Sequence, residues 1–285
     1  MPLISGFDPW RSSLCTCPPK MTFNPYSGCD HHCVYCYASS YVRDFHNCRP
    51  KKDKIRTLLR ESKKLKGEVV SMSNSSDPYP RMEASLGWTR RCLEVFAQAD
   101  CKIQIVTKSN LVTRDEDLLR KMQAIVAITI TTKDDILAEK MEPYAPLPSA
   151  RLRAVKDLLD AGIPTSVRID PIIPKLNDKT DELVAQLAKI GVKHITCSTY
   201  KLRLDNWKRF SEVFPDLASK LVPFYFNQGE RIGGSIFLPK KFRFMLLQQI
   251  KDNAESCGVR FGVCRENLNK LNSAPCDGSW LLSEL

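Results

Sequence analysis

The stretch GCDHHCVYCYA at residues 28–38 places three cysteines, Cys29, Cys33 and Cys36, within eight residues. Thiolates bind zinc or iron–sulfur clusters in preference to harder metals. A structural zinc site closes with four ligands, usually from two separated pairs, and the two histidines inside the stretch would reach the same tetrahedron only in a cramped geometry. A 4Fe-4S cluster held by three cysteines leaves one iron open to an exogenous ligand. The stretch therefore favours such a cluster over zinc or over three buried apolar thiols.

Around this stretch, short β-branched runs alternate with longer segments of helical periodicity, which predicts βα units around a parallel sheet. The predicted strands are residues 21–27, 68–73, 102–107, 125–131, 164–171 and 194–199, with a further extended piece at 259–263. The predicted helices are residues 53–65, 83–98, 115–123, 149–161, 178–190, 204–210 and 241–256. Right-handed crossovers would close these units into a partial (β/α)6 barrel of the α/β class. The cysteine loop follows the first strand, at the end of the barrel where ligands bind.

The regular alternation of strands and helices continues to about residue 202, and its end sets the predicted division of the chain into segments. Residues 1–20 form an N-terminal segment, residues 21–204 the barrel, and residues 205–285 a C-terminal extension packed on the barrel. The extension includes the irregular stretch 224–239.

Composition limits the partners and the compartment. The chain of 285 residues has a formal net charge of +11 and a basic run at residues 49–66. This surplus favours an anionic partner such as DNA or RNA, although a solvated helix face is the alternative explanation for the run. The sequence has no apolar run of about 18 residues and no apolar signal core, so we expect a cytoplasmic protein without a membrane partner. In that compartment the 12 cysteines point to metal rather than to disulfides.

The spacing CxxxCxxC from Cys29 to Cys36, with Tyr35 before the last cysteine, resembles the radical S-adenosylmethionine superfamily. Further stretches resemble its spore photoproduct lyase-related branch, the DNA repair photolyase-like proteins. They are SSDPYPRME at 75–83, VTKSNLVTRDEDLL at 106–119, EPYAPLPSARLRAVKDLLDAGIP at 142–164 and DPIIPKLND at 170–178. The likeness covers roughly residues 24–204 and implies a partial barrel of the radical SAM type.

The resemblance implies an enzyme that binds a 4Fe-4S cluster and S-adenosylmethionine. A low-potential donor of the ferredoxin or flavodoxin type would reduce the cluster, and S-adenosylmethionine would be split to a 5′-deoxyadenosyl radical that abstracts hydrogen from a substrate, with nucleic acid the leading class. The resemblance places the backbone of Tyr35 at the adenine and Lys108 at the cofactor carboxylate. It further implies carboxylate contacts for Thr129 or Thr131, amino-group contacts for Ser75 and Ser76, and ribose or substrate contacts for Arg168 and Asp170. As alternatives, strand-end Ser and Thr often cap helices, and Lys108 could simply be solvated.

One departure from that branch concerns the group that returns hydrogen to the product. Spore photoproduct lyase uses a cysteine near its second strand, and the corresponding stretch VVSMSNSSDP at 69–78 contains none. Cys197, with Tyr200 nearby, is one substitute and Tyr79 is another. A small buried hydrophobic residue is the competing interpretation of Cys197.

The remaining cysteines raise the question of a second site. Cys15 and Cys17 precede the barrel, whereas Cys264 and Cys276 lie near the C-terminus. Four thiolates from the two chain ends would complete a closed site for an auxiliary 4Fe-4S cluster or for zinc, with Cys257 as a competitor for one position. Scattered buried cysteines are the alternative.

Three functions remain in competition. The first is radical chemistry on a nucleic acid. The second is the same chemistry on a protein or peptide side chain or on a small metabolite. The third, from another class, is a non-catalytic nucleic-acid-binding protein stabilised by zinc.

Overall fold

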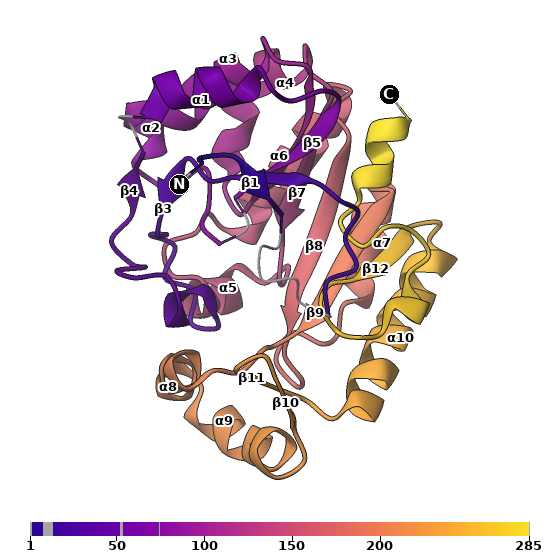
Figure 1. Cartoon of the computed structure of the whole chain (residues 1–285). Coiled ribbons are helices and arrows are strands. Elements are labelled where there is room, and N and C mark those ends of the chain that lie inside the picture. Colours follow the sequence, from indigo (N-terminus) through magenta and orange to yellow (C-terminus); the bar gives the residue numbers. More distant parts are fainter. Residues whose placement is uncertain (1, 8–13, 52–53, 74, 285) are drawn as a thin grey trace.

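The computed structural model describes residues 2–7, 14–51, 54–73 and 75–284. A curved sheet of eight strands dominates it, in the order β1-β2-β5-β6-β7-β8-β9-β12 (Figure 1). The strands are β1 (Ser5–Gly6), β2 (Met21–Phe23), β5 (Glu68–Met72), β6 (Cys101–Thr107), β7 (Ala124–Thr129), β8 (Thr165–Ile172), β9 (His194–Thr199) and β12 (Arg260–Val263). Pairing is parallel from β2 to β12, whereas β1 is antiparallel to β2. The predicted α/β partial barrel is thus confirmed.

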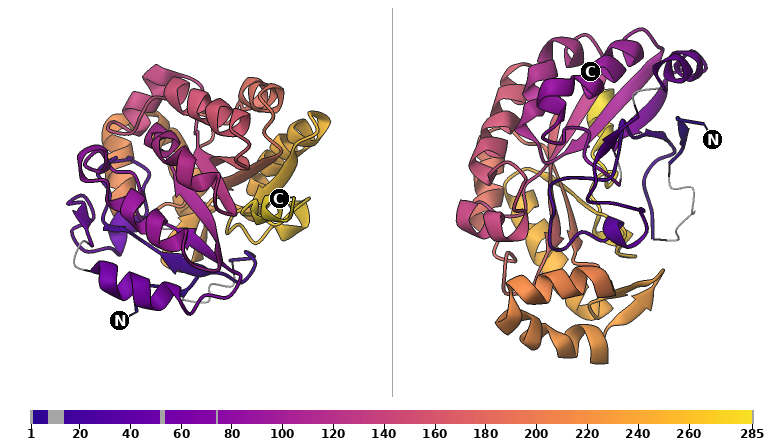
Figure 2. Two further views of the ribbon diagram at one scale, coloured as in Figure 1. Left: turned by 90° about the horizontal axis from the view of Figure 1, so that it is seen from above. Right: turned by 90° about the vertical axis from the view of Figure 1, so that its left-hand side faces the viewer.

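Helices cover the outside of the curved sheet, as both views of Figure 2 show. The helices between successive strands are α1 (Ile55–Ser62), α2 (Glu83–Leu86), α3 (Trp88–Phe96), α4 (Glu116–Leu119), α5 (Asp135–Met141), α6 (Pro148–Asp160) and α7 (Asp181–Lys189). After β9 the chain forms α8 (Leu204–Val213), α9 (Pro215–Val222), the hairpin β10 (Glu230–Ile232) and β11 (Ser235–Phe237), and α10 (Lys240–Ser256). A small two-stranded ribbon pairs β3 (Tyr26–Ser27) with β4 (Arg49–Pro50).

Several predicted elements differ from the observed ones. The helix predicted at 83–98 is two helices, because Gly87 adopts a left-handed conformation with φ of 57° between α2 and α3. The strand predicted at 21–27 is divided into β2 and β3 around Pro25, which has no N–H for a sheet ladder. The helix α5 was not predicted. The predicted start of the first helix, Asp53, lies outside the described residues.

The core follows from the two covered faces of the parallel sheet. All six residues of β7, AIVAIT, are buried, since a central parallel strand contacts side chains on both sides. One apolar cluster joins the strands to the outer helices. A second cluster lies beneath the cysteine loop and joins Tyr35 to Met141, Leu202 and Phe210. The loop therefore rests on a packed apolar base.

Both edges of the sheet come from the ends of the chain. β1 forms one edge, and β12, from the segment predicted as a C-terminal extension, pairs with β9 at the other. In Figure 1 the indigo segment that leads to β2 passes beside the yellow loop that follows β12. Among the described residues, no helix is both long and apolar enough to cross a membrane.

Candidate active site

A cavity of about 260 Å³ lies at the C-terminal ends of the sheet strands. All three loop cysteines line it, together with residues of β7 and β8 and residues that follow β5, β6, β9 and β12. Parallel strands place their carboxyl ends at one edge of a sheet, so side chains far apart in sequence meet there. The cavity is therefore the candidate active site.

Gly28 sets the entry of the cysteine loop. Its φ is +80°, and a Cβ there would lie 2.4 Å from the backbone oxygen of Phe45. The adjacent Cys29 N–H donates to that same oxygen at 2.7 Å. Only glycine allows this close approach, which turns the chain from β3 into the loop.

The loop is docked onto the segment that follows α5. The Val34 N–H donates to the Met141 carbonyl at 2.9 Å, and the Tyr35 hydroxyl donates to the Glu142 carboxylate. Glu142 also pairs with Arg151 at 2.5 Å, and both side chains are fully buried. Burial alone would raise the pKa of Glu142, but Arg151 and Lys108 hold it below its usual value. An ionised, paired carboxylate thus anchors the loop. Sequence reasoning missed Glu142 and Arg151.

Burial disfavours the thiolate form of the three loop cysteines. Burial raises the pKa of Cys29 and Cys36, and it raises that of Cys33 to about 12. Such thiols ionise when a metal supplies the compensating positive charge. In the part of the chain that the structure describes, no group of three or more His, Cys, Asp or Glu residues is arranged to hold a metal ion. A cluster that offers a separate iron to each thiolate does not need the ligands to converge on one ion.

Lys108 follows β6 and lines the cavity. Its ammonium lies 5.6 Å from the centre of the Tyr35 ring. Burial alone would lower the pKa of Lys108, but Cys33 and Glu142 raise it above its ordinary value. The residue is therefore a half-buried cation, suited to an anionic group of a bound ligand.

Asp77 organises this part of the cavity and was missed by sequence reasoning. Its carboxylate accepts hydrogen bonds from the Thr107 hydroxyl and from the Lys108 N–H, both at 2.7 Å. The Tyr79 N–H donates to it at 2.9 Å, and His31 Nδ1 lies 3.6 Å away. One carboxylate thus fixes the ends of β5 and β6 and contacts the cysteine loop. A lone Asp in a serine-rich turn gives no sequence signal for this role.

The serines after β5 also line the cavity. The predicted contacts Ser75 and Ser76 are both in its wall, and Ser76 Oγ donates to the Tyr26 carbonyl at 3.2 Å. Ser73, which was not predicted, also lines it and has a φ of 66°. Its buried hydroxyl has no hydrogen-bond partner in the described structure. An orphaned hydroxyl facing a cavity fits a polar group of a bound ligand.

The two predicted threonines of the fourth barrel strand are placed differently. Thr129, the last residue of β7, lines the cavity. Thr131 is absent from its lining and donates its hydroxyl to Glu142 at 3.1 Å. Of this pair, Thr129 is therefore the one within reach of a ligand.

Arg168 and Asp170 form an ion pair on β8, with Nη2 and Oδ2 at 2.6 Å, and both line the cavity. The Ser198 hydroxyl donates to Asp170, and Lys201 donates to Ser198 at 2.7 Å. Burial alone would raise the pKa of Asp170, but Arg168 and Lys201 hold it below its usual value. This wall presents a fixed pattern of positive and negative groups to a ligand.

The three predicted hydrogen donors lie in different environments. Tyr200 is among the residues that line the cavity, but its side chain is fully buried in the apolar cluster and its hydroxyl donates to Asn206 at 2.7 Å. Cys197 is fully buried in the barrel core and is not part of the cavity lining. Tyr79 is likewise absent from this lining and instead borders a second cavity on the outer side of the loop.

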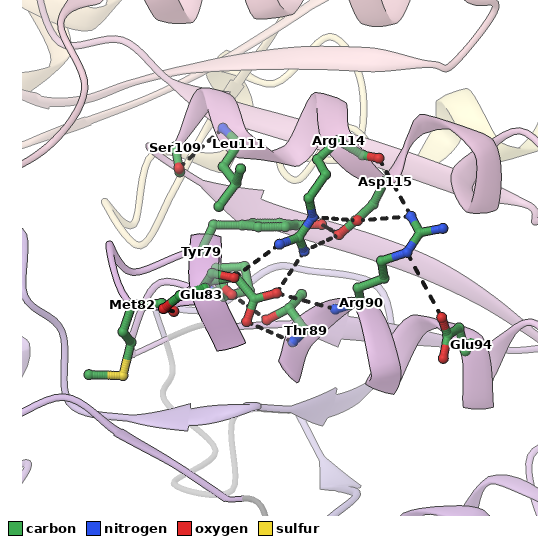
Figure 3. Close-up of polar contacts among 12 residues, drawn as sticks. Tyr79, Met82, Glu83, Thr89, Arg90, Glu94, Ser109, Leu111, Arg114 and Asp115 are labelled. Atoms are coloured by element: carbon green, nitrogen blue, oxygen red, sulfur yellow. Dashed lines mark hydrogen bonds and ion pairs between the residues drawn. The ribbon is translucent and has the colours of Figure 1, made fainter. Parts of the chain in front are cut away.

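Figure 3 shows the Tyr79 side chain within a polar network. Its hydroxyl donates to Asp115 at 3.1 Å, inside a network of two buried carboxylates and two arginines. Arg114 contacts Glu83 at 2.6 Å and Asp115 at 2.8 Å, and Arg90 reaches Asp115 at 3.2 Å. The network joins α2 and α3 to the segment before α4. Tyr79 therefore contributes a structural hydrogen bond.

The four cysteines of the chain ends come together near the cavity. Cys17 and Cys264 line it. The Cys17 and Cys276 sulfurs lie 3.5 Å apart, and the Cys15 thiol hydrogen-bonds that of Cys17.

The arrangement fits a 4Fe-4S cluster with S-adenosylmethionine. Three thiols share a cavity with a half-buried cation, an orphaned hydroxyl and a strand-end threonine. Cys29, Cys33 and Cys36 would hold the cluster, which when bound with S-adenosylmethionine supplies radical chemistry at carbon. The chain's own groups bind and orient the ligand.

The sequence of this chain was compared with protein families and with known proteins. The model of the "Radical SAM superfamily" matches residues 23–188. An uncharacterized protein of Mycobacterium tuberculosis is 27% identical over 255 residues, covering 82% of this chain and 73% of that protein. The "Radical SAM Nalpha-GlyT isomerase" of Pseudomonas phage M6 is 24% identical over 257 residues, covering 85% of this chain and 53% of that protein.

Among solved structures, a spore photoproduct lyase variant with bound AdoMet and dinucleoside spore photoproduct has a TM-score of 0.66. It is 14% identical in sequence, and the match covers 90% of this chain and 79% of that one. This likeness extends the shared fold beyond the barrel strands matched by the family model. The match to the family model shows that the chain belongs to the radical SAM superfamily and is a radical SAM enzyme, and the cysteine loop and the cavity agree with this assignment.

Proposed function

We propose that this radical SAM enzyme abstracts a hydrogen atom from a nucleic-acid substrate at the mouth of the cavity. The observation that carries the proposal is the cavity wall, where Lys108, Arg168, Lys201 and Arg265 share one space with the cysteine loop. Cationic side chains attract phosphates, and the formal net charge of +11 adds a general attraction to nucleic acids.

Two similar proteins support this substrate class. The solved spore photoproduct lyase holds a dinucleoside spore photoproduct, and the fold of this chain matches it with a TM-score of 0.66. The phage relative is named as an Nalpha-GlyT isomerase. We infer a related reaction on a nucleotide or base, without the hydrogen-donating cysteine that the sequence lacks near its second barrel strand.

We assign the following roles within the cavity. Lys108 and Thr129 would bind the carboxylate of S-adenosylmethionine, and the serines after β5, including Ser73, would bind its amino group. The Arg168–Asp170 pair would orient the ribose or the substrate. Tyr200 is the proposed hydrogen donor, because this residue lines the cavity whereas Cys197 and Tyr79 do not.

The remaining partners follow from the chemistry. A low-potential donor of the ferredoxin or flavodoxin type would supply the electron. We infer a cytoplasmic location, because all 12 cysteines are free thiols and thiolate-bound clusters require a reducing compartment.

The test uses anaerobically reconstituted, reduced protein with S-adenosylmethionine and uniformly deuterated oligonucleotides, single-stranded and duplex. Deuterium should appear in 5′-deoxyadenosine, and a Cys33→Ala control should give none. Parallel reactions contain deuterated peptides or a deuterated metabolite extract. Transfer from either of these, with none from any oligonucleotide, would overturn the proposed substrate class while leaving the enzyme class intact.

A further inference from the structure

The two ends of the chain meet at the edge of the active-site cavity. Cys17 precedes β2 and Cys276 follows β12, 259 positions apart in sequence, yet their sulfurs lie 3.5 Å apart. The Thr16 hydroxyl also contacts the Cys276 sulfur at 3.7 Å. Figure 1 shows the indigo and yellow segments side by side at this place. Nothing in the local sequence requires these segments to meet.

Four thiols share this meeting point. The Cys15 thiol hydrogen-bonds that of Cys17, and Cys264 interacts electrostatically with Cys17. The Cys17–Cys276 separation exceeds the about 2.05 Å of a disulfide bond.

The framework around the four thiols is fixed by buried contacts. A Cβ on Gly262 would lie 2.6 Å from the Cys276 Cα, so only glycine lets this loop lie against β12. The Thr196 hydroxyl donates to the Cys276 carbonyl at 2.7 Å. On the other side, the Lys20 ammonium pairs with Asp277 at 2.5 Å, and both side chains are buried.

Positive groups adjoin the thiols. The Lys20 ammonium interacts electrostatically with Cys17. The Arg168 guanidinium hydrogen-bonds Cys264, the residue after β12. A tetrathiolate site carries excess negative charge even with its metal, and such outer groups stabilise it. The set therefore has the donors and the surrounding charge of a metal centre.

We propose that Cys15, Cys17, Cys264 and Cys276 hold a second metal centre, either an iron–sulfur cluster or a zinc ion, that joins the chain ends at the edge of the cavity. Four thiolates are the ligand set that both of these centres use. Among the side chains that the structure describes, the set is not yet arranged to hold a metal ion, so binding would draw the sulfurs together. This centre is separate from the cluster of the cysteine loop and goes beyond the proposed reaction.

The experiment measures iron, labile sulfide and zinc in the anaerobically purified full chain. With one 4Fe-4S cluster on the loop, a second cluster raises the iron from about four to about eight per chain. A zinc centre gives instead about four irons and one zinc. The Cys17→Ala, Cys264→Ala double variant should lose the extra four irons or the zinc, whereas a Cys257→Ala control should lose neither.

A second variant keeps the test decisive if the double variant does not fold. The Cys29→Ala, Cys33→Ala, Cys36→Ala triple variant should retain about four irons or one zinc. About four irons and no zinc in the unmodified protein, with no metal in the triple variant, would overturn the second centre. If the unmodified protein holds the extra metal but shows no activity on nucleic acid, that result would count against the proposed function alone.

Discussion

The Asp77 carboxylate accepts a 2.7 Å hydrogen bond from the backbone N–H of Lys108, and this bond joins the ends of β5 and β6. A second oxygen of the same carboxylate holds Thr107 at 2.7 Å. The position of the half-buried Lys108 cation in the cavity thus depends on a residue that contacts the cysteine loop as well. Asp77 is a positioning residue for the site.

Replacing Asp77 with Asn should test this role. The amide keeps the size of the side chain but removes its charge, and hydrogen bonds to charged groups contribute about 1.5–3 kcal/mol each. We expect a loss of about 1–3 kcal/mol in the free energy of unfolding, measured by urea denaturation. The Kd for S-adenosylmethionine should rise, with the iron content unchanged. Asp100→Asn, at the exposed turn before β6, is the matched control and should change neither quantity.

The Tyr35→Phe variant tests the docking of the cysteine loop. It removes the hydroxyl that donates to the buried Glu142 carboxylate, which then loses one of its partners. We expect a destabilisation of about 1–3 kcal/mol and a faster loss of iron to a chelator. Tyr144→Phe serves as the control, because that side chain is 47% exposed. Equal iron release from both variants would show that the hydroxyl does not hold the loop.

Gly262→Ala should displace the loop that carries Cys276. The new Cβ would lie 2.6 Å from the Cys276 Cα, where backbone must move. Overpacking of this kind costs about 1–3 kcal/mol, so the melting temperature should fall. Gly6→Ala is the control, because among the described residues other than its two chain neighbours no atom lies within 4 Å of its added Cβ. Equal melting temperatures for the two variants would contradict the close packing of the Cys276 loop on β12.

His194 predicts a pH dependence of stability. Burial lowers its pKa from 6.5 to about 4, while its ring contacts Trp280 and Thr196. Between these values the unfolded chain binds a proton that the folded chain does not, so stability falls as the pH decreases from about 6.5 to about 4. The lowered pKa of His194 changes the free energy of unfolding by on the order of 3 kcal/mol over this pH range.

Urea denaturation between pH 7 and pH 5 checks this expectation, with His194→Asn for comparison. The variant should be less stable at pH 7, because it loses ring contacts, but its stability should depend less on pH. Parallel pH curves for the two proteins would contradict a neutral buried His194.

The family and most of the fold could be predicted from local signals. Three cysteines with fixed spacing on one loop indicate a cluster with an open iron, and alternating short apolar runs indicate a parallel sheet. These signals arise from residues close in sequence. The resemblance to the radical SAM superfamily implied cofactor contacts for Lys108 and Thr129, and both residues line the cavity.

The tertiary structure added the residues that position the site. Glu142 reaches the loop from 107 positions beyond Tyr35, and Asp77 reaches Lys108 across 31 positions. Neither belongs to a periodic pattern, because a single hydrogen bond across a fold imposes no spacing on the sequence. The left-handed Gly87 and the helix α5 were also missed, since both depend on local turns rather than on apolar periodicity.

The sequence by itself determined two things. The cysteine loop indicated the cluster chemistry, and the alternating apolar runs indicated the succession of strands and helices along the chain. The tertiary structure alone decided which distant groups share a space, such as Cys17 with Cys276 and Arg168 with Cys264. The physical reason is that thiol spacing along a loop is a local property. Contacts between chain ends depend instead on how β12 pairs with β9 and on the buried Lys20–Asp277 ion pair.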